Sequence, residues 1–83
     1  MTDEEILSLV REGVLHSMPE LSSEVDRITL ETSLTEAGLD SVGMLESAAY
    51  IEEKLGADFP DDQLAHVETV SDLAALIRGH ASR

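Results

Sequence analysis

The sequence contains no cysteine, and aromatic residues make up only 2% of its 83 positions. Without cysteine, the protein can form neither a disulfide framework nor a thiolate metal site. The scarcity of aromatics means that the core must be built from Leu, Ile, Val, Ala and Met. Hydrophobic residues make up 42% of the chain, which is enough for it to fold. A core of this size supports one domain, residues 1–83, and stabilises it by roughly a few kcal/mol.

Basic residues are also scarce, since five Lys and Arg stand against 18 Asp and Glu and leave a net charge of −13. Proteins bind nucleic acid by neutralising phosphates with basic side chains, so nucleic acid is a very poor partner for this chain. An anionic membrane surface is disfavoured for the same reason. The charge favours solubility and can steer the protein toward basic patches on other proteins, but a solvated acidic surface without a further role explains it equally well.

Long apolar runs are missing too. No stretch is long enough to span a membrane, and the first five residues are acidic where a signal peptide would be basic. We therefore expect a soluble cytoplasmic protein.

Helical spacing of apolar residues predicts an all-α fold, a small bundle of three longer helices and one short third helix. The first helix covers residues 3–17, with Thr2 as its N-cap and Met18-Pro19 as its end. Its core side consists of Ile6, Leu9, Val10, Gly13, Val14 and Ser17. No segment alternates as a strand would.

A connection of about twenty residues, 19–40, follows the first helix. Connections this long without structure are uncommon in compact domains. We expect a loop that is pinned to the core, with one helical turn within residues 22–26. Its apolar anchors are Leu21, Val25, Ile28, Leu30, Leu34 and Leu39.

The second helix, residues 41–55, is the best marked, because Asp40 is a good N-cap and Gly56 a natural C-terminal stop. Gly38 permits the tight approach of the chain before it. The core side of this helix consists of Met44, Ala48, Ile51 and Leu55.

A short third helix is predicted at Pro60-Asp61-Asp62, with Leu64 and Val67 turned inward. The last helix covers residues 70–80. Thr69 caps it, and Asp72 takes the third position of a capping-box pattern. Its core side consists of Val70, Leu73, Ala74, Ile77 and Ala81.

Residues suited to catalysis or metal binding are hard to find. The histidines are scattered without the spacing of a metal site and are expected at the surface: His16, His66 and His80. Adjacent residues of a helix point about 100° apart, so two acidic pairs cannot converge as acid and base: Glu52-Glu53 and Asp61-Asp62. No segment follows the calcium-loop pattern. We expect neither catalysis by the chain itself nor a metal site.

Ser41 opens the second helix directly after its capping residue, on a solvent-facing corner behind the long connection. A phosphate ester at this position would meet free backbone N–H groups and the positive end of the helix dipole. On position alone, an ordinary polar residue at a helix start is the more common explanation.

The side of the second helix opposite its core side carries a second apolar stripe next to Ser41. With its acidic neighbours, this side is typical of a docking surface with an apolar centre and a charged rim. Scattered surface apolar residues are the ordinary alternative. The residues concerned are Val42, Leu45, Glu46, Ala49 and Glu53.

The run Gly38-Leu39-Asp40-Ser41-Val42 resembles the phosphopantetheine attachment motif of acyl carrier proteins, in which Gly-x-Asp-Ser is followed by Leu or Ile. The resemblance extends over nearly the whole chain, with matching residues in 32–38, 46–53 and 59–70. It implies that Ser41 carries a covalent 4'-phosphopantetheine arm derived from coenzyme A. It also implies that Asp40 assists recognition by the transferase that installs the arm, and that Glu46 and Glu53 contact partner enzymes.

The same resemblance implies what the protein does. The arm's thiol would hold acyl or aminoacyl cargo as a thioester, while the protein catalyses nothing. The implied partners are a phosphopantetheinyl transferase, a loading ligase or acyltransferase, and downstream synthase, condensation or tailoring enzymes. We expect the carrier to be a monomer.

Three positions depart from the family pattern. Val42 replaces the usual Leu or Ile, and Ala49 is small where a larger apolar residue is common. Gly43 stands where most members have a larger residue, at a cost of roughly 0.5–1 kcal/mol to the helix.

The run of residues 37–41 resembles stand-alone carriers of bacterial specialised pathways, polyketide, nonribosomal peptide or related, more than fatty-acid carriers. A carrier of fatty-acid synthesis stays the alternative. From another class, a small acidic helical adaptor without a covalent cofactor fits the position and the charge. It does not account for the Gly-x-Asp-Ser run and its flanking matches.

Overall fold

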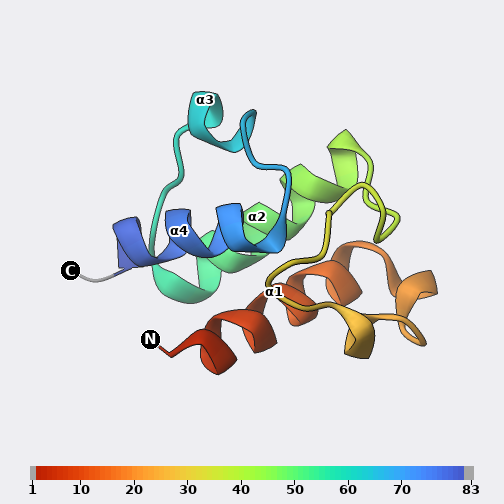
Figure 1. Ribbon diagram of the computed structural model, residues 1–83. Coiled ribbons are helices and arrows are strands. Elements are labelled where there is room, and N and C mark those ends of the chain that lie inside the picture. Colours follow the sequence, from red (N-terminus) through yellow and green to blue (C-terminus); the bar gives the residue numbers. More distant parts are fainter. Residues whose placement is uncertain (1, 82–83) are drawn as a thin grey trace.

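This computed structural model describes residues 2–81, with Ala81 described by its backbone alone. The described part of the chain contains four α-helices and two short 3-10 helices (Figure 1). The α-helices are α1 (Asp3–Ser17), α2 (Ser41–Leu55), α3 (Asp61–Leu64) and α4 (Val70–Ala81). The 3-10 helices, η1 (Pro19–Leu21) and η2 (Val25–Arg27), lie in the connection between α1 and α2. The all-α prediction is confirmed, and α4 ends one residue later than expected.

Side-chain caps fix the starts of α1 and α4. Thr2 and Glu5 exchange two hydrogen bonds, of 3.2 and 2.8 Å, between side chain and backbone. Thr69 and Asp72 do the same at 3.2 and 3.1 Å, and the Asp72 carboxylate also accepts from the backbone N–H of Glu68 at 3.0 Å. The caps predicted at Thr2 and Thr69 are therefore confirmed as capping boxes.

The inward sides of the helices meet in one apolar core, and Ser47 is the single polar side chain buried with them in the described part of the chain. The core positions predicted for the helices are confirmed, except that Ser17, Met44, Leu55 and Val67 are only partly buried and the Ala81 side chain lies outside the description. Two predicted anchors of the connection, Leu21 and Leu30, are also only partly buried. Leu9 completes the inner side of α1. Arg78, near the end of α4, pairs with Asp3 at the start of α1.

Helices α1 and α2 approach closely at Gly13, where a Cβ would stand 3.1 Å from the carbonyl oxygen of Ser47. The Ser47 hydroxyl lies 3.3 Å from the carbonyl oxygen of Gly13, to which it donates, and shares a 2.8 Å hydrogen bond with the Ser17 hydroxyl. Ser47 is thus satisfied inside the bundle, and none of its polar atoms faces solvent.

The connection between α1 and α2 is held first by Arg11, which projects from α1. Its guanidinium donates to the carbonyl oxygen of Ile28 at 2.6 and 3.2 Å and to that of Asp26 at 3.3 Å. A single helical turn was expected within residues 22–26, but the connection contains two: η2 begins at Val25 and runs beyond that range, and η1 was not predicted. Val25 and Ile28 are buried, as predicted.

The same connection is held a second time by the start of α4. Ser33 and Thr69 form an isolated antiparallel bridge. Beside it, Leu34 donates to the carbonyl of Glu68 at 2.9 Å, and Ser71 donates to that of Leu30 at 2.8 Å. The prediction of a loop pinned to the core is confirmed, although its backbone pairing with α4 was not predicted. No helix within residues 2–81 has the length and apolar character needed to cross a bilayer.

Candidate functional site

Ser41 is the first residue of α2, and its side chain is exposed. Asp40 caps the helix, since its carboxylate accepts a 2.7 Å hydrogen bond from the backbone N–H of Gly43. Among the described residues, the backbone N–H groups of Ser41 and Val42 have no hydrogen-bond acceptor. The Ser41 hydroxyl therefore stands in solvent beside two free donors, at the positive end of a fifteen-residue helix.

The turn that leads into α2 depends on Gly38. This residue has φ of 103°, which side chains with a Cβ rarely adopt, and its N–H donates to the carbonyl of Thr35 at 3.0 Å. Leu39, the next residue, is buried and donates to the carbonyl of Leu34 at 3.1 Å. Anchored by Leu39, the chain emerges at Asp40 and Ser41, which both face solvent.

The outward face of α2, which comprises Val42, Leu45, Glu46, Ala49 and Glu53, is exposed as the helical spacing predicts. Val42 is 63% exposed and Leu45 is 54% exposed. Within residues 2–81 the structure has one other large apolar side chain of this kind, Leu15 on α1. Two of these three side chains thus lie within four positions of Ser41.

A cleft of about 620 Å³ opens beside Ser41 between α2 and α3. We call it the α2–α3 cleft. Most of its lining is apolar, and it comprises Leu34, Leu39, Met44, Leu45, Leu64 and Val67 together with Ser41 and neighbouring polar residues. The helical pattern assigned Met44 and Val67 to the core, and their partial exposure toward this space was not predicted.

Met18 was expected only to end the first helix, and its contact with α2 was not predicted. It caps the end of α1, and its side chain packs against the backbone of Gly43 in the first turn of α2. No sequence signal links these two residues, which are 25 positions apart. The Met18 side chain, at the C-terminal end of α1, therefore packs against the first turn of α2, which carries Ser41.

The remaining titratable residues do not gather at this site. His16 and His66 are exposed as predicted, whereas His80 is partly buried, with its ring 5.7 Å from that of Phe59. Glu52 accepts a 2.6 Å hydrogen bond from the backbone N–H of Phe59, which gives it a structural role. Within residues 2–81 no three His, Asp or Glu side chains lie close enough together to hold a metal ion.

Comparison with known proteins assigns residues 19–77 to a family described as "Phosphopantetheine attachment site". An acyl carrier protein of Lactobacillus acidophilus is 27% identical over 81 residues, which cover 96% of this chain and 98% of the relative. The meromycolate extension acyl carrier protein of Mycobacterium tuberculosis is 35% identical over 94% of this chain and 66% of its own length. The acyl carrier protein MbtL of Mycolicibacterium paratuberculosis is 38% identical over 78% of this chain and 72% of its own.

Proposed function

Because this chain belongs to the acyl carrier protein family, whose members carry covalent 4'-phosphopantetheine and are not catalysts, we propose that Ser41 is its attachment residue. One observation carries the proposal. Ser41 ends the Gly-Leu-Asp-Ser run and is also an exposed hydroxyl at a helix start with two free N–H donors. A phosphodiester on this oxygen would be anionic, so those donors and the helix dipole would stabilise it.

The residues around Ser41 fit such a group in shape as well as in charge. When bound, phosphopantetheine supplies a flexible arm whose terminal thiol carries acyl groups as thioesters. Gly38 and the Asp40 cap orient the serine outward, and the α2–α3 cleft leaves open space beside it. The Asp40 carboxylate is exposed next to the hydroxyl, where a phosphopantetheinyl transferase can contact both.

Partner enzymes, in this proposal, dock on the outward face of α2. Its centre is apolar at Val42 and Leu45, and its rim is acidic at Glu46 and Glu53. Interfaces commonly combine an apolar centre that contributes affinity with rim charges that steer association. The partners would be the transferase, a loading ligase or acyltransferase, and synthase, condensation or tailoring enzymes that a monomeric carrier meets in the cytoplasm.

The pathway that we propose is a specialised one, of the polyketide or nonribosomal peptide kind. The run of residues 37–41, which resembles that of stand-alone carriers of such pathways, favours it. The relatives also include carriers named for meromycolate extension and MbtL, besides a plain acyl carrier protein. The second candidate is a carrier of fatty-acid synthesis, which the full-length match to the Lactobacillus acyl carrier protein favours.

The test is the intact mass of the protein after incubation with a broad-specificity phosphopantetheinyl transferase and coenzyme A. The wild-type chain should gain the mass of one phosphopantetheine group, and Ser41→Ala should gain none while its helical circular dichroism stays unchanged. Ser71→Ala is the matched control, because Ser71 is also exposed in the first turn of a capped helix but follows no Gly-x-Asp run. Modification of Ser41→Ala would overturn the assignment, and an unmodified wild-type chain would favour the adaptor function.

A further inference from the structure

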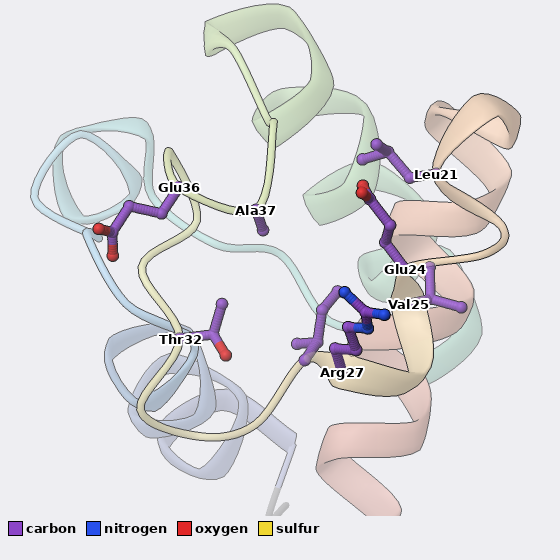
Figure 2. Close-up of a pocket in the computed structure, with 8 residues that line it drawn as sticks. Leu21, Glu24, Val25, Arg27, Thr32, Glu36 and Ala37 are labelled. Carbon is purple, nitrogen blue, oxygen red and sulfur yellow. The ribbon is translucent and has the colours of Figure 1, made fainter.

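A second cleft, of about 220 Å³, lies within the connection between α1 and α2. We call it the connection cleft. Figure 2 shows Leu21, Glu24, Val25 and Arg27 on one side of it and Thr32, Glu36 and Ala37 on the other. The sequence did not predict this cleft, and the function proposed above gives it no role.

The inside of the connection cleft is apolar. Its lining includes Val25 and Ile28, which are 8% and 4% exposed, and the partly buried Leu21 and Ala37. An apolar cavity of roughly 150 Å³ is large enough to bind benzene. A space of this size therefore accepts one aliphatic or aromatic side chain and is too small for a folded element.

The surroundings of the connection cleft are acidic. Glu24 and Glu36 lie on opposite walls with exposed side chains, and Arg27 is the one basic residue at the cleft. Residues 19–40 contain six acids against this one base: Glu20, Glu24, Asp26, Glu31, Glu36 and Asp40. Within residues 2–81 the one ion pair joins Asp3 and Arg78, so none of the six is neutralised by a salt bridge there.

An occupant of the connection cleft must match both properties. Inserting one apolar side chain removes the exposed lining from water, which is how anchor residues contribute most of the affinity at interfaces. Basic residues on either side of that anchor would face Glu24 and Glu36, whereas acidic neighbours would be repelled. A small neutral ligand would leave the carboxylates without partners.

We propose that the connection cleft is a docking point for a partner protein that inserts one aliphatic or aromatic side chain flanked by Lys or Arg. This contact is separate from the outward face of α2. Ala37 precedes Ser41 by four residues, which span at most about 14 Å of extended chain. If Ser41 carries the arm as proposed above, a partner seated in the cleft holds the arm's root close to its own surface.

The experiment uses the full-length, arm-bearing protein labelled with ¹⁵N and three acetylated, amidated peptides: Lys-Lys-Leu-Lys-Lys, its Leu-to-Ser analogue, and Glu-Glu-Leu-Glu-Glu. At millimolar concentration, the first peptide should shift the amide resonances of Leu21, Val25, Ile28 and Ala37 in a saturable way. The serine analogue should cause much smaller changes, and the acidic peptide should cause none. Equal shifts with the leucine and serine peptides, shifts confined to α2, or no shifts at all would overturn the proposal.

Two variants and a control make the test specific. Ala37→Leu fills the cleft and should abolish the saturable shifts; unchanged binding by this variant would contradict the proposal. Glu36→Lys leaves the core untouched, because its side chain is exposed, and should weaken binding by roughly two- to fivefold. Glu31→Lys makes the same charge change in the same connection, outside the lining, and should weaken binding less. Equal losses in the two lysine variants would mean that the peptide responds to overall charge and not to the cleft.

Discussion

The sulfur of Met18 lies 2.9 Å from the point where a Cβ would stand on Gly43, so the Met18 side chain at the end of α1 occupies space that any larger residue 43 would need. The same Cβ would stand 3.2 Å from Oδ1 of Asp40, the oxygen that caps α2. The departure of Gly43 from the family pattern therefore has a packing reason. The Met18 thioether occupies the space that a larger residue 43 would take.

Gly43→Ala should therefore fail to stabilise the protein, although alanine in a helix is favoured over glycine by about 1 kcal/mol. The added methyl group must displace Met18 and press on the Asp40 cap. In a Met18→Ala background the same change should stabilise by up to roughly 0.5–1 kcal/mol, because the closer of the two contacts is gone and only that with Asp40 remains. Urea unfolding of the four proteins in this double-mutant cycle measures the coupling. Equal stabilisation in both backgrounds would show that Met18 does not restrict residue 43.

Leu45→Ala and Ile51→Ala should separate docking from folding. Ile51 is 0% exposed in the core, so its truncation should cost about 2–5 kcal/mol. Leu45 is 54% exposed, so its truncation should change the melting temperature little but impair arm installation at every salt concentration. Thermal melts paired with transferase kinetics check both. If the two variants melt equally early, the outward face of α2 is not the docking surface.

Glu46→Lys and Glu53→Lys should slow arm installation most strongly at low ionic strength. Rim charges act mainly on the association rate, and salt screens them over about 8 Å at physiological concentration. Asp58→Lys is the matched control, since Asp58 is exposed but lies beyond the end of α2. Transferase rates should be measured for all three across a salt series. The same rate loss in the control would assign the effect to net charge alone.

The pKa of Asp72 is lowered below its ordinary value, chiefly by the backbone N–H of Glu68 and then by that of Thr69. A lowered folded-state pKa stabilises the protein fully above the ordinary carboxyl value of 3.8 and loses that contribution as the pH falls through the lowered value. Asp72→Ala should therefore reduce the melting temperature at pH 7, and its difference from wild type should shrink below about pH 4.

Melting temperatures of wild type and Asp72→Ala from neutral to acid pH provide the measurement. Asp58→Ala serves as a control, because no hydrogen bond holds the Asp58 side chain in the described part of the chain. A difference for Asp72→Ala that stays constant through the acid range would show that the carboxylate charge does not contribute to the cap.

Salt should raise the melting temperature of the whole domain. The net charge is −13, and the structure has one ion pair, Asp3 with Arg78, among residues 2–81. Self-repulsion among unpaired carboxylates therefore opposes folding, and sodium chloride screens it. Melts across a sodium chloride series test this, with a divalent cation as a second series. A flat or falling trend would mean that the charges are better compensated than the geometry indicates.

The helix boundaries could be predicted because their signals are local. Thr2, Asp40 and Thr69 each cap a helix through atoms three residues away, and Gly56 ends α2 with φ of 65°. Likewise the exposure of Leu45 follows from the 100° rotation per residue that puts Ile51 on the core side.

The clefts and the support of Ser41 could not be predicted, because they depend on residues distant in sequence. Arg11 is 17 positions from the carbonyl of Ile28 that it holds, and nothing in a helical pattern distinguishes it from a solvent-facing arginine. Met18 and Gly43 likewise meet only once α1 has packed on α2. Such contacts follow from the tertiary arrangement and leave no periodic trace in the sequence.

The bridge between Ser33 and Thr69 can form only after the chain has been synthesised as far as Thr69. The stretch between these residues contains Ser41, α2 and α3, and its closure fixes the backbone that leads into the motif. A ribosome makes residues 68–71 long after Ser41 has been polymerised, so a nascent chain that ends before α4 lacks this closure. The backbone before Ser41 can therefore take its final geometry only after the start of α4 has been made, and we expect the arm proposed for Ser41 to be added after that point.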